Sequence, residues 1–325
     1  MAVIETTASS VLQEVRPQRR YRTLRVLATK KLAMVAIAYL LVFYVAGVFA
    51  PLVATQDPTR TELSVDARLQ GPSADHWFGT DRLGRDLYSR VVYSARTTIL
   101  FTLAVILTGG LFLGLGLGLL AGYRGGWIDT VVMRVGEVLS GLPTLIMMLA
   151  ITAAFRTQID TLSFDLADNT WLSVADARTL VKFSIIVGAT VPFAWVGSAR
   201  IVRAQALAIR ELTFVTAAEA SGASTFRILT RHIFPGVMPL FIVGLSAGMA
   251  GIAGAEVALS YLGLGIDAPT ASFGNLIGEG AGARAFEQYP HVLIFSSLPV
   301  ILFFFSWNLL GGALVDILEP KAHQV

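Results

Sequence analysis

Side chains that carry out catalysis or bind metals are sparse in this sequence of 325 residues. It contains no cysteine, which excludes disulfides, thiolate metal ligands and cysteine nucleophiles. It also lacks the Gly-x-x-x-x-Gly-Lys-Ser/Thr loop that cradles the phosphates of ATP in many ATPases. The four histidines show no paired spacing typical of a metal site: His76, His232, His291 and His323. We therefore expect a chain that is not an enzyme and that has neither a metal site nor a cofactor of its own.

Ionisable residues inside long apolar stretches are candidates for a transport role, because a charge in the membrane is costly. Arg134 and Glu137 are three residues apart, so on a helix they lie on one face and can pair. Glu256 lies toward the end of another apolar stretch. Two interpretations stay open for all three residues: a structural contact, or a place on the translocation path.

The most informative polar segment is 203–235, which separates two apolar stretches. Its first part is rich in alanine and favours a helix. Gly222 interrupts this helix, and Ser224 is a suitable N-cap for a second helix over about 225–233, before Pro235. The sequence therefore predicts a helix, a glycine turn and a second helix.

The residues on the polar face of this segment are small and of mixed type rather than mainly basic. Ala217, Ala218 and Gly222 would let another protein approach closely. A helix resting on lipid headgroups is the alternative, but its polar face would be mainly basic. We therefore favour contact with a protein.

Long apolar stretches dominate the rest of the chain. Hydrophobic residues make up 54% of it and charged residues 14%, whereas soluble domains carry about 25% charged residues. A helix needs about 20 apolar residues to cross a bilayer. Six stretches qualify: 33–55, 98–122, 131–155, 181–201, 236–260 and 291–316. Backbone groups in lipid must bond internally and the stretches do not alternate in polarity, so we predict an all-α integral membrane protein with six transmembrane helices.

Lysine and arginine near the ends of these stretches predict the orientation. The basic tail 1–32 lies in the cytosol, and six crossings return the tail 318–325 to the same side. The arginine-containing segment 203–235 then also faces the cytosol. Segment 56–97 falls on the outer side although it is rich in arginine. The net charge of +3 is too small to indicate nucleic-acid binding.

Glycine recurs at every fourth position in the second apolar stretch: Gly110, Gly114, Gly118 and Gly122. These glycines line one helix face, where a neighbouring backbone can approach closely. We interpret the pattern as packing within the chain, with a role in the substrate path as the alternative. Gly244 and Gly248 favour the same packing interpretation.

Segment 203–235 resembles the cytoplasmic loop of binding-protein-dependent ABC transporter permeases. That family's pattern is Glu-Ala-Ala, three residues, Gly, nine residues and a short stretch that ends in Leu-Pro. Four positions match it: Ala217, Ala218, Gly222 and Pro235. Thr216 stands where the family usually has Glu, and Phe234 where it usually has Leu. The resemblance implies that a partner ATPase contacts these residues: Thr216, Ala217, Ala218, Glu219, Gly222, Ala223, Ser224 and Arg227.

Three further stretches narrow the resemblance to the second permease subunit of dipeptide and oligopeptide importers. They are His-Trp-Phe-Gly-Thr-Asp-Arg-Leu-Gly-Arg-Asp from residue 76, Ser-Tyr-Leu-Gly-Leu-Gly from 260 and Asn-Leu-Leu-Gly-Gly-Ala-Leu-Val-Asp from 308. The likeness covers about residues 30–320. It implies a type I importer permease fold, with a core over 98–317 and a cytosolic coupling loop over 203–235.

The resemblance also implies partners and a location. We expect a heterodimer with a homologous permease subunit, two cytosolic ATPases that bind ATP and magnesium, and an extracytoplasmic solute-binding protein. The expected location is the cytoplasmic membrane of a bacterium or archaeon, in contact with lipid. Members of this subfamily import dipeptides, oligopeptides, glutathione, nickel complexes or glycans. The alternative is a self-contained secondary transporter or channel, for which Glu137 and Glu256 are the candidate ion-coupling groups.

Overall fold

The computed structural model describes residues 29–318, and within this range the chain forms helices joined by loops, without a β-strand. The all-α fold class predicted from the apolar stretches is confirmed. Most of the predicted basic tail 1–32, and all but the first residue of the predicted tail 318–325, lie outside the described residues.

Between residues 29 and 318, five continuous helical stretches and one bent pair of helices are long and apolar enough to cross a membrane. They comprise α3 (Lys31–Val48), α5 (Leu87–Val105) with α6 (Gly116–Arg124), α7 (Gly126–Ser140) with α8 (Thr144–Ala154), α10 (Val174–Arg210), α13 (Phe234–Tyr261) and α16 (Pro290–Leu318). A π-helical stretch, Ile106–Leu115, joins α5 to α6. The shorter helices are α4 (Ala50–Val53), α9 (Arg156–Asp168), α11 (Thr213–Ala220), α12 (Thr225–Ile228), α14 (Phe273–Gly280) and α15 (Ala283–Gln288).

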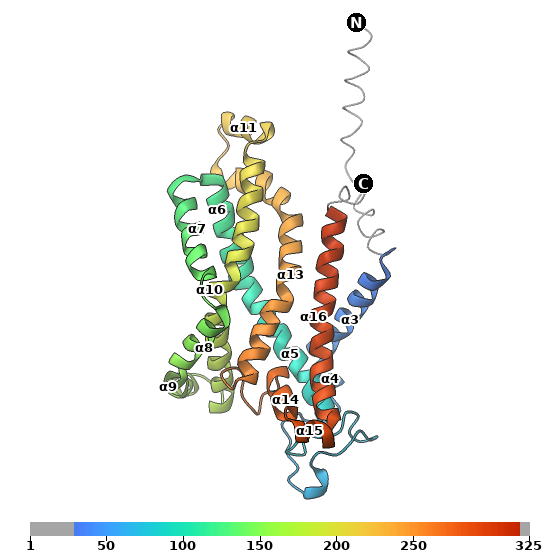
Figure 1. The fold of residues 1–325 in the computed structure, drawn as a ribbon. Coiled ribbons are helices and arrows are strands. Elements are labelled where there is room, and N and C mark those ends of the chain that lie inside the picture. Colours follow the sequence, from blue (N-terminus) through green and yellow to red (C-terminus); the bar gives the residue numbers. More distant parts are fainter. Residues whose placement is uncertain (1–28, 319–325) are drawn as a thin grey trace.

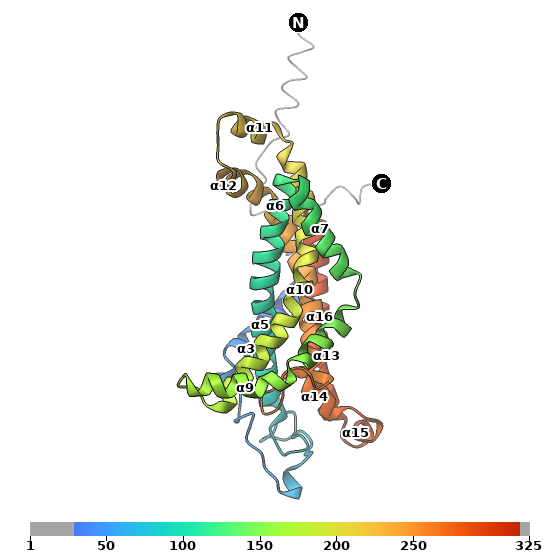
Figure 2. The ribbon, with the colours of Figure 1, turned by 90° about the vertical axis from the view of Figure 1, so that its left-hand side faces the viewer.

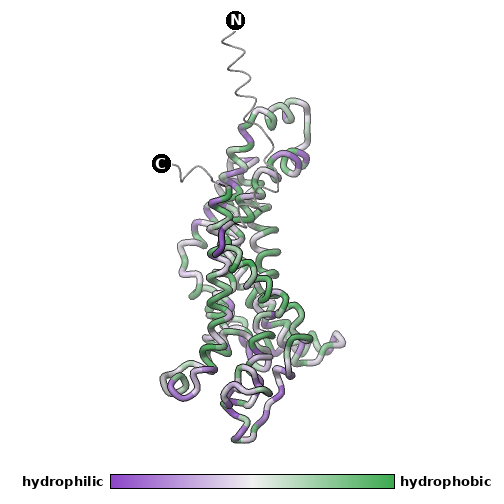
Figure 3. The backbone as a smooth tube through the Cα atoms, turned by 90° about the vertical axis from the view of Figure 1, so that its right-hand side faces the viewer, coloured by the Kyte–Doolittle hydropathy of each residue, from purple (hydrophilic) through white to green (hydrophobic). Residues whose placement is uncertain are grey.

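The long helices alternate in direction, so their connections gather at two ends of the molecule (Figure 1). We call them the α11 end, where α11 and α12 lie, and the α14 end, where α9, α14 and α15 lie (Figure 2). Lys30 and Asp316 form an ion pair of 2.5 Å at the α11 end, which joins the start of α3 to the end of α16. Hydrophobic residues predominate along the helices, and hydrophilic residues gather toward both ends (Figure 3).

The third predicted span, 131–155, is not one straight helix. It is divided into α7 and α8, which meet at an angle of 88°. Gly141, Leu142 and Pro143 lie at the break. Proline has no backbone N–H, and it disfavours helical geometry in the residue before it, so Leu142 cannot continue α7. The hydropathy of the stretch carries no information about this bend.

Two other spans are longer than predicted. α5 begins at Leu87 rather than at residue 98, because the Asp86 carboxylate caps it by accepting a hydrogen bond of 2.8 Å from the Ser89 amide. Residues 87–97, predicted to belong to the outer segment, are therefore helical. α10 extends beyond 181–201 at both ends and contains Pro192 without ending there.

The glycine face predicted in the second span is a packing surface, as expected. A Cβ atom built on Gly114 would lie 2.6 Å from the Cβ of Ser198, and one on Gly122 would lie 2.6 Å from the Cβ of Ala206. Gly118 is in equally close contact with Val202, at 2.7 Å. The second span and α10 therefore approach at a distance that leaves no room for side chains at these positions.

Gly118→Val is expected to lower the free energy of unfolding by about 3 kcal/mol, because the added atoms collide with Val202 and with the backbone of α10. Gly116→Val is the matched control on the same helix, since a Cβ there meets no atom within 4 Å. Unfolding of the purified chain in detergent, followed by circular dichroism, measures both. Equal losses in the two variants would contradict the packing argument.

Candidate functional site

The α11 end carries the predicted helix, glycine turn and helix. α11 ends at Ala220, Gly222 has a φ of +77°, and α12 starts at Thr225. Ser224 caps α12, its hydroxyl accepting a hydrogen bond of 3.4 Å from the Arg227 amide. A positive φ is readily adopted only by glycine, so the turn depends on the residue that the sequence supplies there.

The predicted end of the second helix is wrong. α12 does not stop before Pro235 but continues through a π-helical turn, Leu229–Ile233, into α13. Pro235 then lies in the first turn of α13, where its missing N–H is tolerated. The polar segment is therefore continuous with a membrane-spanning helix.

Buried side chains pack α11 and α12, which together form the tip of the α11 end, against the neighbouring long helices. Val215 of α11, Ile228 of α12 and Ile233 are almost fully buried. They pack in one apolar cluster with Val202 and Ala206 of α10 and with Val237 and Phe241 of α13. A displacement of α11 and α12 would therefore be passed directly to α10 and α13, because close-packed interiors are stiff.

Polar contacts hold the base of the tip. Arg203 of α10 binds both carboxylate oxygens of Asp129 at the start of α7, with distances of 2.5 Å. The Arg210 guanidinium lies over the ring of Tyr123, 5.9 Å from its centroid. The hydroxyl of Tyr123 also interacts with the carboxylate of Glu219 on α11. Asp129 and Tyr123 were not singled out from the sequence, because nothing in their local pattern marks these long-range partners.

The outer face of the tip is exposed and partly apolar. Ala217 and Gly222 are exposed, and Ala218 is half-buried. Two large apolar side chains lie beside them, Phe214 on α11 and Phe226 just beyond the turn, the latter 76% exposed. Small residues next to exposed aromatic ones are typical of a surface that another protein covers.

The predicted path residues do not come together. Arg134 and Glu137 form the predicted ion pair, at 3.0 Å, on an exposed face of α7. Glu256 is fully buried against α5 and accepts hydrogen bonds from Ser260, at 2.9 Å, and Thr98, at 3.4 Å. A role of these three residues in translocation stays a prediction.

A mid-membrane cavity of about 280 Å³ was not predicted from the sequence. It lies between the π-helical stretch of the second span, α8, α10 and α13. Gly197, Gly248 and Gly251 line it, and a Cβ on any of them would meet no atom within 4 Å. The packing interpretation therefore holds for Gly244, which contacts Ile201, but not for Gly248. Glycine spacing alone does not separate these two situations.

A buried ionic network occupies the α14 end. Arg90 of α5 is fully buried and pairs with Asp81 and with Glu279 of α14, the latter through bonds of 2.6 and 3.0 Å. Arg85 binds the same two carboxylates, at 2.7 and 3.0 Å. Two arginines and two acids thus join the predicted outer segment 56–97 to α14. They account for two of the six arginines in that segment, whose position the charge rule left unexplained.

One five-residue string in α13 has the form of a hydrolase nucleophile motif, Gly244-Leu-Ser246-Ala-Gly248. Such a motif needs a sharp turn between a strand and a helix. Ser246 instead lies inside α13, and its hydroxyl donates a hydrogen bond of 2.9 Å to the Ile242 carbonyl. The string therefore lacks the setting of a nucleophile.

Comparisons with known proteins agree along nearly the whole chain. The family described as "Binding-protein-dependent transport system inner membrane component" matches residues 114–324, and the "N-terminal TM domain of oligopeptide transport permease C" matches residues 20–72. The chain is 36% identical to the dipeptide transport system permease protein DppC of Bacillus subtilis, over 92% of this chain and 85% of the relative. It is 32% identical to DppC of Alkalihalophilus pseudofirmus and to the oligopeptide permease OppC of Bacillus subtilis, over 91% of this chain and 88% of each relative.

Proposed function

This chain belongs to the family of binding-protein-dependent transport system inner membrane components, and from that premise we propose that it imports dipeptides or short oligopeptides as one membrane-spanning subunit of an ABC transporter. The names of the relatives, which are dipeptide and oligopeptide permeases, support the peptide substrate. A self-contained secondary transporter or channel finds no support in these relatives.

The observation that carries the proposal is the tip formed by α11 and α12. It exposes small and aromatic residues, and it is anchored through Val215 and Ile228 to two membrane-spanning helices. We propose that a cytosolic ATPase binds this face. Residues 216–219, 222–224 and Arg227 would form the contact, and ATP-driven closure of the ATPases would move α10 and α13.

The complete transporter follows from the same proposal. A homologous permease subunit completes a heterodimer, two ATPases bind ATP and magnesium, and a solute-binding protein docks at the α14 end. The α11 end, where Lys30 pairs with Asp316, then faces the cytosol of a bacterium or archaeon. Arg134 and Glu137, on the exposed face of α7, and the buried Glu256 of α13 would belong to the translocation path of this transporter.

The first test of the proposal is whether ATP binding and hydrolysis belong to the partner ATPases and not to this chain. The purified chain is expected neither to bind nor to hydrolyse ATP, since it has no phosphate-binding loop. In proteoliposomes, uptake of the labelled dipeptide Ala-Phe should require the second permease, both ATPases, the binding protein and ATP. Uptake by the chain alone, or ATP hydrolysis by it, would show that the proposed function is wrong.

A further inference from the structure

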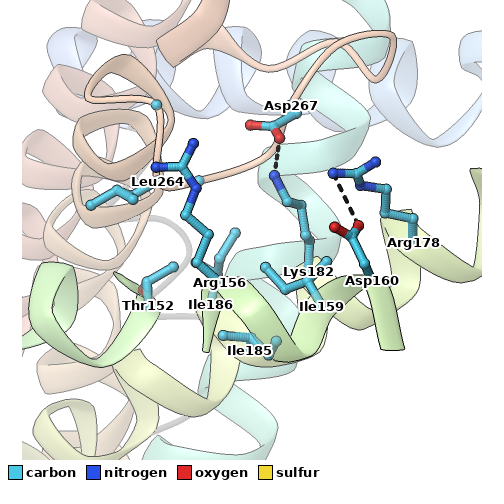
Figure 4. A pocket seen from close by; sticks show the side chains of 12 residues that line it. Thr152, Arg156, Ile159, Asp160, Arg178, Lys182, Ile185, Ile186, Leu264 and Asp267 are labelled. Carbon is cyan, nitrogen blue, oxygen red and sulfur yellow. Dashed lines mark hydrogen bonds and ion pairs between the residues drawn. The ribbon is translucent and has the colours of Figure 1, made fainter. Parts of the chain in front are cut away.

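A charged pocket of about 260 Å³ opens at the α14 end (Figure 4). Its walls come from the junction of α8 and α9, from the first turns of α10, and from the loop that follows α13. Figure 4 shows the side chains of Arg156, Lys182 and Asp267 directed toward the same space. Residues distant in sequence therefore converge on one site.

The charges in this pocket do not balance. Three cationic side chains, Arg156, Arg178 and Lys182, face two acidic ones, Asp160 and Asp267. Arg178 pairs with Asp160 at 3.2 Å, and Lys182 pairs with Asp267. Within residues 29–318, Arg156 has no carboxylate within ion-pair distance. One positive charge is thus left for an anionic group from outside the chain.

The Lys182–Asp267 pair separates this pocket from a second one. A neighbouring cavity of about 560 Å³ shares Arg178, Lys182 and Asp267 with it and continues toward Thr270. Its volume falls in the range of small-molecule sites, roughly 300–1,000 Å³. A ligand that replaced the contact between Lys182 and Asp267 would join the two cavities into one larger site.

The charged pocket also lies in line with the mid-membrane cavity. Thr152 of α8 lines the charged pocket, and Met148, one turn away on the same face, lines the mid-membrane cavity. Ile186 and Thr190 of α10 are related in the same way. The two cavities therefore follow each other along the same faces of α8 and α10. This is the arrangement expected of two successive binding sites on one translocation path.

We propose that the charged pocket binds short zwitterionic solutes by their charged ends, an inference that rests on the proposed import function. The solute carboxylate binds Arg156 together with Lys182, because guanidinium groups hold carboxylates through two parallel hydrogen bonds. The solute ammonium group binds Asp267, which has released Lys182. Lys182 and Asp267 each lose one partner in the chain and gain one on the solute, and Arg156 gains a share of the same carboxylate. The solute therefore replaces the broken ion pair and leaves the net charge of the pocket unchanged.

The test measures binding of Ala-Phe to the assembled permease–ATPase complex without the binding protein, by saturation-transfer difference NMR. Arg156→Gln is expected to weaken binding about tenfold or more, since a hydrogen bond to a charged group is lost. Ala-Phe amide, which lacks the carboxylate, should bind the unaltered complex about as weakly. Arg60→Gln, an exposed arginine outside the pocket, is the matched control and should change nothing.

Three results would overturn the proposal. They are no detectable binding of Ala-Phe, equal binding of Ala-Phe and its amide, and unchanged binding in Arg156→Gln. If Arg156→Gln instead weakened only the affinity of the complex for the solute-binding protein, the pocket would be a protein contact. Uptake of Ala-Phe by the unaltered transporter is measured in parallel, so that a failure of the import function is recognised separately from a failure of this site.

Discussion

Arg90→Ala is expected to lower the free energy of unfolding by about 3–5 kcal/mol, the usual cost of removing one partner from a buried ion pair. Arg90 is fully buried, and its loss leaves the carboxylates of Asp81 and Glu279 facing Arg85 alone. One negative charge would then be buried without compensation. Denaturant unfolding of the purified chain in detergent measures the effect.

Matched variants separate this effect from a general sensitivity of the α14 end. Arg82→Ala removes an exposed arginine from the loop that precedes α5 and should change stability by less than about 0.5 kcal/mol. The double variant Arg90→Met, Glu279→Gln removes one charge of each sign and should recover part of the loss. If Arg90→Ala and Arg82→Ala were equally stable, the network would not be holding the α14 end together.

Gly222→Val is expected to abolish dipeptide uptake while the chain remains folded and inserted. Valine at a φ of +77° is strained by about 1–3 kcal/mol, which is enough to shift the turn between α11 and α12 into another geometry. A Cβ at this position meets no atom of the chain, so the damage comes from the backbone and from the blocked approach of a partner. ATP hydrolysis by the assembled complex should no longer rise when the loaded binding protein is added.

Gly222→Asn is the control for this variant. Asparagine tolerates the left-handed conformation better than other residues with a side chain. Its uptake should therefore exceed that of Gly222→Val by a wide margin, although its side chain reduces the approach of a partner. Normal uptake by Gly222→Val would show that the tip formed by α11 and α12 does not couple ATP hydrolysis to transport.

Local patterns in the sequence predicted the features that depend on local physics. The glycine face from Gly110 to Gly122 followed from helical periodicity, and the turn at Gly222 with its Ser224 cap followed from backbone preference. The structure bears out both the packing of Gly114, Gly118 and Gly122 and the geometry of the turn. Both of these predictions depend only on residues that lie within a few helical turns of one another in the sequence.

Features that depend on distant partners could not be predicted in this way. Arg90 and Glu279 are 189 residues apart, so the sequence does not show that the charges at the start of α5 are paired and buried, and hydropathy alone places the start of this span at residue 98 rather than at Leu87. The open space at Gly248 also depends on neighbouring helices, whereas the 88° bend has its cause in Pro143 itself. The charged pocket likewise brings together residues from three parts of the chain.

The length of α10 has a mechanical consequence. Its 37 residues span about 55 Å at 1.5 Å per residue, so a tilt of about 5° about one end displaces the other by about 5 Å. Arg203 and Val202 lie near the end that packs under the tip, and Lys182 lies near the opposite end. Asp267 belongs to a different element, the loop after α13. A tilt of α10 of this size, driven by the proposed ATPases, would therefore change the distance between Lys182 and Asp267 and with it the hold of these two charges on a solute.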